Sequence, residues 1–156
     1  MALVLADLLK ESHVDLDLRT RTMATAVGKL IKLLQADETI RDPEKFLEQV
    51  IAREEVSPTI VESEIAFPHA RTDLVDKIIL GMGRSRAGIS FGPDGERAKL
   101  IFLIGVPRQM ISNYLVCVGA LARLLKDPEV RQRMLVAETP TEFVAALQEP
   151  DPNRFD

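Results

Sequence analysis

The sequence feature that most constrains the fold is a nearly continuous apolar run from Leu100 to Val106. A strand with one face in water alternates apolar and polar residues, whereas an uninterrupted apolar run is typical of a central strand covered on both faces. Patterns typical of helices lie before and after it, over residues 22–35, 43–53, 115–125, 128–135 and 140–147. This order predicts an α/β fold, a single-domain three-layer α/β/α sandwich with a mixed central sheet.

Local signals place several element boundaries. Two shorter strand-like runs cover residues 64–67 and 77–84, and Phe91-Gly-Pro-Asp-Gly95 predicts a turn, because Pro and Gly supply its unusual dihedral angles. Asp42-Pro43 predicts the N-cap and first position of a helix that ends near Arg53. Pro150 and Pro152 end regular structure, so we expect one domain over residues 1–149 and a C-terminal tail over 150–156.

Composition excludes several classes of protein. The 156 residues include 20 Lys and Arg against 24 Asp and Glu, a net charge of −4, and only 4% are aromatic, so nothing indicates a nucleic-acid partner. The single Cys117 cannot form an internal disulfide and is expected to serve packing in a reducing compartment. No stretch approaches the roughly 20 apolar residues that cross a bilayer, and the first residues lack the basic region of a signal peptide. We therefore expect a cytoplasmic protein with no direct membrane insertion.

Only two histidines could supply imidazole chemistry. His13 lies in a polar stretch, residues 10–17, and is expected to be an exposed or loosely packed side chain of a connector. His69 follows Phe67-Pro68 directly after a strand-like run. Proline restricts the backbone there, so the strand is expected to end sharply and to project His69 from its C-terminal end, where α/β sheets generally bind ligands. On spacing alone, a structural role for His69 explains the pattern equally well.

The segments Arg53-Glu-Glu55 and Glu64-Ile-Ala-Phe-Pro-His-Ala-Arg71 resemble the signature of type 2 EIIA domains of the phosphotransferase system, the fructose, mannitol and nitrogen-regulatory type. The resemblance covers nearly the whole chain and includes the turn at residues 91–95, the strand at 100–107 and the Leu-Ala-Arg-Leu-Leu-Lys-Asp-Pro segment at 121–128. It implies that His69 accepts a phosphoryl group from the phosphocarrier HPr and passes it to the IIB domain of a sugar permease, or holds it as a regulatory mark.

The resemblance also implies roles for two other residues. Neutral imidazole is a nucleophile near pH 7, and transfer of a phosphoryl group needs positive charge around it. Arg53 matches the family arginine and is expected to clamp phosphoryl oxygens, although a surface arginine at a helix C-terminus is the structural alternative. Tyr114 stands where many members have a second histidine; its hydroxyl can donate a hydrogen bond, and packing explains it equally well. The candidate catalytic residues are thus His69, Arg53 and Tyr114.

The chain departs from the family pattern in the loop before His69. The family loop is rich in glycine, whereas this chain reads Ser-Pro-Thr-Ile-Val-Glu-Ser-Glu over residues 57–64 and keeps only Thr59. We expect a stiffer loop, with the carboxylates of Glu62 and Glu64 pointing outward. No spacing typical of a metal site is present, so no metal and no cofactor are expected. Four basic residues, Arg84, Arg86, Arg97 and Lys99, could form a rim for an acidic partner, and a solvated face is favoured.

Two functions of different kinds remain open. The first is a phosphoryl carrier, a phosphotransferase component with a phosphohistidine intermediate, favoured by Arg53 and by Pro68-His69-Ala70. The second is a regulatory module that docks to a protein target with little or no phosphoryl transfer, favoured by the missing glycines and by Tyr114. A hydrolase with a Ser–His pair is set aside, because the sequence has no nucleophile elbow.

Overall fold

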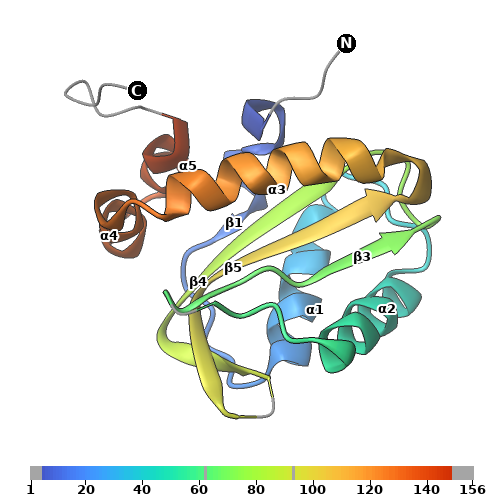
Figure 1. The fold of residues 1–156 in the computed structure, drawn as a ribbon, viewed down its shortest axis with the longest axis horizontal. Helices are drawn as coiled ribbons and strands as arrows, with labels where there is room; N and C mark the ends of the chain where they lie inside the picture. Colours follow the sequence, from blue (N-terminus) through green and yellow to red (C-terminus); the bar gives the residue numbers. More distant parts are fainter. Residues whose placement is uncertain (1–4, 62, 93, 149–156) are drawn as a thin grey trace.

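The computed structural model describes residues 5–61, 63–92 and 94–148, which form a five-stranded mixed sheet with helices on both faces (Figure 1). The long strands β4 (Ile79–Phe91) and β5 (Glu96–Pro107) form an antiparallel hairpin at its centre. The short strand β1 (Val14–Asp15) pairs in parallel with β4, while β2 (Ile65–Ala66) and β3 (His69–Thr72) pair in parallel with β5. The two short strands β2 and β3 follow one another along the same edge of β5.

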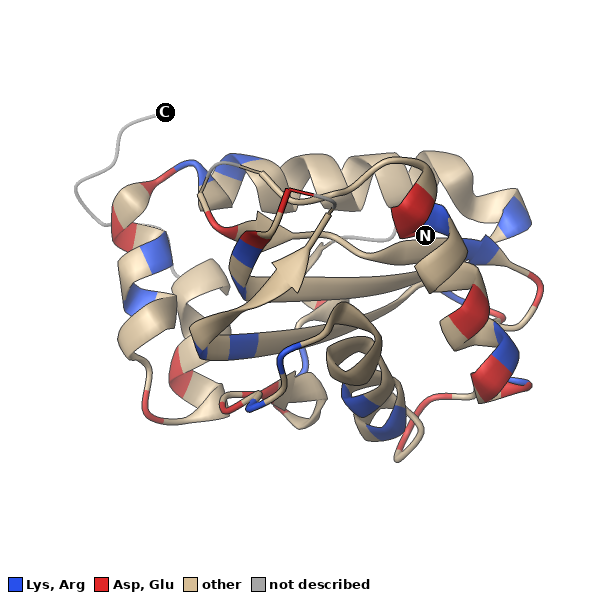
Figure 2. Cartoon of the chain, turned by 90° about the horizontal axis from the view of Figure 1, so that it is seen from below, with Lys and Arg blue, Asp and Glu red and all other residues tan. Residues whose placement is uncertain are grey.

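Helices cover the two faces of the sheet separately (Figure 1). One face carries α1 (Met23–Leu34) and α2 (Pro43–Val56). The other carries α3 (Ile111–Leu125), α4 (Pro128–Val136) and α5 (Pro140–Gln148). Three short 3₁₀ segments complete the described part, at Leu5–Leu8, Glu11–His13 and Arg108–Met110. Charged residues lie mostly on helices and loops, and the central strands carry few of them (Figure 2).

The apolar run of β5 contributes to both layers of the core. Leu100, Phe102 and Ile104 pack in the cluster under α3, whereas Ile101 and Leu103 pack in the cluster under α1 and α2. Successive side chains of a strand point to opposite faces, so an apolar residue at every position is what a strand between two layers requires. The predicted three-layer α/β/α sandwich with a mixed sheet is confirmed. Cys117 is buried in the layer under α3, as expected for a packing residue.

The predicted start of α2 is confirmed and its end is corrected. The Asp42 carboxylate accepts a hydrogen bond from the backbone N–H of Lys45 at 3.2 Å, and Pro43 takes the first helical position. The helix continues past Arg53 to Val56, because none of the residues 54–56 breaks a helix. It stops before Ser57-Pro58, because the residue before a proline disfavours the helical conformation.

Several strand boundaries differ from the predictions, because they depend on pairing with segments that are distant in the sequence. The polar stretch 10–17 is not a simple connector, because Val14 and Asp15 pair with Met82 and Gly83 of β4. Strand β4 runs on to Phe91 through a bulge, where Gly88 has a φ of +85°. The predicted turn at 91–95 has positive φ at Gly92 and Gly95. The predicted tail, residues 150–156, lies outside the described residues, so the boundary at residue 149 stays a prediction. No helix in the described ranges is long and apolar enough to span a membrane.

Candidate functional site

His69 is the first residue of β3. The prediction that His69 projects beyond the C-terminal end of the preceding strand is therefore wrong. The chain does not leave the sheet after Phe67-Pro68; it re-enters at once, and His69 pairs with Ile104 of β5. The ring is half-buried, and its Nδ1 lies 2.9 Å from the carbonyl oxygen of Phe67. A carbonyl oxygen only accepts hydrogen bonds, so this contact requires a proton on Nδ1. In the neutral ring, Nε2 then presents its lone pair.

A chain of hydrogen bonds holds Phe67, the residue whose carbonyl accepts from the His69 ring. Glu54, at the end of α2, is only 3% exposed. Its carboxylate accepts from the backbone N–H of Thr59 at 2.5 Å and from the Thr59 hydroxyl at 2.6 Å. The Thr59 Oγ1 in turn accepts from the backbone N–H of Phe67 at 3.0 Å. Thr59, the one loop residue shared with the family pattern, therefore ties the Phe67 peptide to α2.

The three candidate catalytic residues lie around one cavity of about 330 Å³. Its walls come from α2, β3, the end of β5 and the start of α3. The rings of His69 and Tyr114 lie 5.4 Å apart between centroids and are tilted by 33°. The cavity is lined by Gln49, Arg53, His69, Ala70, Arg71, Val106, Ile111 and Tyr114.

The cavity carries positive charge. Arg53 donates from Nη1 to the carbonyl oxygen of Ser57 at 2.8 Å, and Arg71 donates from Nε and Nη2 to the carbonyl oxygen of Arg108 at 3.1 and 2.9 Å. Both guanidinium groups are thus positioned by neutral carbonyls, and none of the described lining residues is a carboxylate. Burial raises the pKa of the Tyr114 hydroxyl, while the charge of Arg53 acts in the opposite direction. The hydroxyl remains a neutral donor.

Sequence reasoning missed two polar residues that line this cavity, Gln49 and Arg71. Gln49 lies one helical turn before Arg53 on α2, and its Oε1 is buried with no hydrogen-bond partner in the described part of the chain. Arg71 lies two positions after His69 in β3, so the two side chains share a face of the strand. The spacings i, i+4 in a helix and i, i+2 in a strand would have identified both, given the positions of Arg53 and His69.

The acidic loop residue Glu64 does not reach the cavity. Glu64 is exposed, and its carboxylate lies 3.8 Å from the Lys99 ammonium. The expected outward direction is confirmed for Glu64, and Glu62 lies outside the described residues. The backbone of Glu64 has a φ of +62°, in the left-handed region that favours glycine. The missing glycines of the loop have therefore left at least one residue in a conformation that glycine would adopt more readily.

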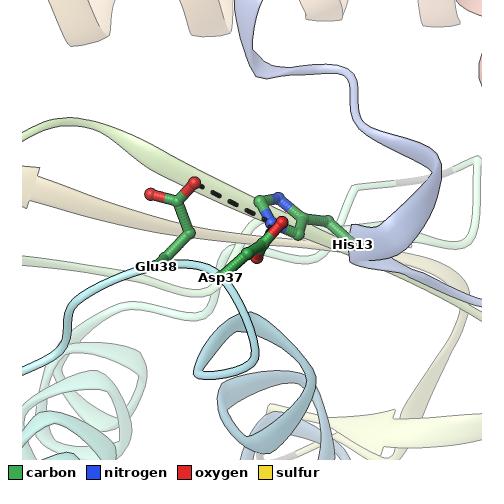
Figure 3. Close-up of side chains that lie close together, drawn as sticks. All are labelled: His13, Asp37 and Glu38. Atoms are coloured by element: carbon green, nitrogen blue, oxygen red, sulfur yellow. Dashed lines mark hydrogen bonds and ion pairs between the residues drawn. The ribbon is translucent and has the colours of Figure 1, made fainter.

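His13 is not the exposed side chain that the sequence predicts. It is 2% exposed, and its Nε2 donates to Asp37 Oδ1 at 2.6 Å and lies 3.9 Å from Glu38 Oε1 (Figure 3). The buried Glu38 carboxylate also contacts two ammonium groups, with Lys10 Nζ at 2.7 Å and Lys77 Nζ at 3.3 Å. These contacts join the segment before β1 to the residues that follow α1 and to Lys77, just before β4.

His13, Asp37 and Glu38 place one ligand atom each within 4.8 Å of one another, a grouping that sequence spacing did not reveal. Two ammonium groups and two carboxylates already balance in charge here, and a divalent cation would have to displace Lys10 from Glu38. The hydrogen bond from His13 is the main cause that lowers the pKa of Asp37. The cluster is best described as an ion-pair network that secures the N-terminal segment.

Comparisons with known proteins agree on one family. The family model for "Phosphoenolpyruvate-dependent sugar phosphotransferase system, EIIA 2" matches residues 7–149. The chain is 34% identical over 119 residues to the fructose-specific EIIA component of Haloferax volcanii, covering 76% of this chain and 77% of that protein. It covers only 23% of the fructose-specific EIIABC component of Bacillus subtilis.

Solved structures share the fold. The nitrogen regulatory protein IIA-Ntr from Neisseria meningitidis superimposes with a TM-score of 0.82 at 24% identity, over 91% of this chain and 97% of that one. The mannitol enzyme IIA of Escherichia coli, in complex with phosphorylated mannitol enzyme IIB, gives a TM-score of 0.74 at 21% identity, over 90% and 96% of the two chains. With the match over residues 7–149, the chain belongs to the EIIA 2 family of the phosphoenolpyruvate-dependent sugar phosphotransferase system.

Proposed function

We propose that the chain is a phosphoryl carrier that accepts a phosphoryl group from HPr on Nε2 of His69 and passes it to a IIB domain. The observation that carries this proposal is the hydrogen bond from Nδ1 to the Phe67 carbonyl, which leaves the Nε2 lone pair for attack. In the first step a bond forms between Nε2 and phosphorus while the bond to the donor atom breaks. In the second step the IIB nucleophile takes the same group, and Nε2 regains its lone pair.

The charges around the cavity support this chemistry. The transition state of phosphoryl transfer spreads negative charge over three oxygens, so fixed cations stabilise it more than they stabilise the free ring. Arg53 and Arg71 supply two guanidinium groups whose other hydrogen bonds go to carbonyls. The neutral Tyr114 hydroxyl and the Gln49 amide group are two further donors for phosphoryl oxygens.

The surface next to the cavity supports a protein partner. Ile111 lines the cavity at the start of α3, and the exposed side chains of Leu115 and Val116 follow Tyr114 on the same helix. Apolar groups beside a charged cavity suit a transient interface, in which a partner must approach and leave. The mannitol enzyme IIA was solved with its IIB partner, which supports a IIB domain as the acceptor for this chain.

A regulatory module is the second candidate, and two observations favour it. Tyr114 cannot become cationic as a second histidine could, and the loop over residues 57–64 has no glycine to let a phosphoryl donor approach closely. The match to a nitrogen regulatory protein shows that the fold also occurs in a protein named for regulation. Such a module would dock to a protein target with little or no transfer.

Labelling with phosphoenolpyruvate, enzyme I and HPr separates the two functions. We expect label on the wild-type chain and on His13→Gln, and none on His69→Ala, with circular dichroism to confirm that each variant folds. His13→Gln is the matched control because it replaces the only other histidine and keeps a donor for Asp37. Label on His69→Ala would overturn the site. An unlabelled wild type would favour the regulatory module.

A further inference from the structure

A second hollow lies at the opposite end of the sheet from His69. It has a volume of about 530 Å³, within the range of small-molecule sites. Its walls are residues 17–21 before α1, residues 85–88 and Ser90 in the bulged part of β4, and Arg97 on β5. In Figure 1 this is the far end of the β4–β5 hairpin, beside the start of α1, whereas β3 and α2 lie toward the other end.

The hollow is separate from the His69 cavity. His69 pairs with Ile104 of β5, and Arg97 comes seven residues earlier in the same strand. At about 3.3 Å per residue, the two positions are roughly 23 Å apart along the strand. The two cavities share no lining residue among those described, so an anion bound here would not occupy the place of the phosphoryl group.

Four arginines line the hollow: Arg19, Arg21, Arg86 and Arg97. The one carboxylate among the described lining residues, Asp17, accepts from Arg19 Nε at 2.7 Å and can offset one of the four charges. The side chains of Arg21 and Arg86 make no hydrogen bond or ion pair with another described residue. The four side chains are exposed, and in a chain of net charge −4 they form a local concentration of positive charge around the hollow.

The structure also corrects the basic rim suggested by the sequence. Arg84 is not a solvated residue: it is 4% exposed and donates to the carbonyl oxygens of Leu16 and Ala137 at 3.1 and 2.6 Å. Its own carbonyl accepts from Leu18 at 2.8 Å, so it secures the segment that carries Arg19 and Arg21. Lys99 contacts Glu64 instead. Only Arg86 and Arg97 of the four predicted rim residues line this hollow.

Hydrogen bonds between side chains and the backbone hold the walls of the hollow. The N–H of Gly88 donates to the Ser85 hydroxyl at 3.1 Å, and Arg97 Nη1 donates to the carbonyl oxygen of Ala87 at 3.4 Å. Thr22, the N-cap of α1, forms a bridge with Ser90, so the 12-residue helix α1 begins beside the hollow. Its first turn contains no acidic residue, and its N-terminal partial charge therefore adds to that of the arginines.

We propose that this hollow binds a small anion that carries two phosphate groups. The planar guanidinium matches phosphate oxygens with paired hydrogen bonds, and three arginines without a carboxylate partner in the lining offset most of the charge of such a ligand. The described lining contains no aromatic side chain, so a nucleobase has nothing to stack on, and the ligand class is a diphosphate or a sugar bisphosphate rather than a nucleotide. The proposal is independent of phosphoryl transfer at His69.

Binding of inorganic diphosphate and of fructose 1,6-bisphosphate to the full chain tests the proposal. Calorimetry should show binding of at least one probe, and the amide resonance of Gly88 should shift on titration. The double variant Arg21→Gln/Arg86→Gln should weaken binding at least tenfold, because each lost guanidinium removes a charge-assisted hydrogen bond. Binding of diphosphate alone would assign the inorganic ion, and binding of the bisphosphate would assign the sugar ester.

The control double variant is Arg123→Gln/Lys126→Gln, which removes the same charge from exposed positions at the end of α3. It should bind both probes as the wild type does, and thermal unfolding should show that both double variants fold. Equal weakening in the two double variants would overturn the proposal in favour of general charge attraction. So would the absence of a Gly88 shift at millimolar probe, or a largest shift at Ala70 beside His69.

Discussion

The N–H of Phe67 donates to the Thr59 hydroxyl, and the carbonyl of Phe67 accepts from the His69 ring. The single residue Phe67 thus connects the loop over residues 57–64 to the imidazole. Thr59 is held by the buried Glu54 carboxylate at the end of α2. The orientation of the His69 ring therefore depends on a residue ten positions earlier in the chain. A catalytic group positioned by such supporting contacts loses activity when they are removed, even though they do not touch the substrate.

Thr59→Val should destabilise the fold and slow phosphorylation of His69. The substitution keeps the shape of the side chain but leaves the Phe67 N–H and one oxygen of the Glu54 carboxylate without their partner. We expect a loss of about 1–3 kcal/mol in the free energy of unfolding, measured in urea. Thr59→Ser keeps the hydroxyl and should retain most of the stability and the labelling rate. Similar labelling rates in Thr59→Val and the wild type would show that the chain of hydrogen bonds does not position the ring.

Arg53→Gln should reduce the initial rate of phosphoryl transfer from HPr by about 10²–10³, the usual cost of removing one preorganised group that stabilises developing negative charge. The labelling rate of Arg53→Lys should lie between the rates of Arg53→Gln and the wild type, because lysine keeps the charge and loses the planar pair of donors. The measurement is the initial rate of labelling at saturating phosphoenolpyruvate. Arg123→Gln, on the exposed face of α3, serves as the control. A rate for Arg53→Gln within twofold of the control would assign Arg53 a purely structural role.

Tyr114→Phe distinguishes a hydrogen-bonding role from packing. The variant keeps the ring that lies against His69 and removes only the hydroxyl. If the hydroxyl donates to a phosphoryl oxygen, the labelling rate should fall by about 2- to 12-fold, the equivalent of one neutral hydrogen bond. Tyr114→His should retain the rate of the wild type or exceed it, since a second imidazole can become cationic. An unchanged rate in Tyr114→Phe would leave packing as the role of Tyr114.

The His13–Asp37 pair makes stability depend on pH in the acidic range. The hydrogen bond from His13 lowers the pKa of Asp37 in the folded chain below its value in the unfolded chain. The unfolded chain therefore binds the proton first as the pH falls, and the contribution of Asp37 to stability is lost between its unfolded pKa, about 3.9, and its lower folded pKa.

Urea unfolding between about pH 2 and pH 5, the range that contains the loss, measures this effect. The free energy of unfolding should fall less steeply with decreasing pH in Asp37→Asn than in the wild type. Asp94→Asn, a substitution in the exposed turn of the hairpin, should keep the slope of the wild type. Parallel pH profiles for Asp37→Asn and the wild type would contradict the contribution of the pair.

Much of the fold could be predicted because the deciding signals are local. The uninterrupted apolar run Leu100–Val106 indicates a strand that is buried on both faces. The adjacent residues Asp42 and Pro43 indicate the start of a helix without reference to any distant residue. The resemblance that starts at Arg53 and Pro-His-Ala led to the cavity residues His69, Arg53 and Tyr114 as a set. Their catalytic roles stay predictions until the labelling experiments are done.

What only the tertiary structure decided depends on pairs of residues far apart in the chain. His13 is buried because Val14 pairs with Met82 and because Asp37, 24 residues away, supplies an acceptor. Arg19 and Arg86 line one hollow because Thr22, at the start of α1, forms a bridge with Ser90, which follows the bulge in β4. Periodicity along a segment tells which face of that segment is buried, but the partner it meets is set by strand order and register. The sequence alone therefore determined the helices, the central strand and the family resemblance, whereas strand pairing determined the short strands β1 and β3 and which charged residues lie together.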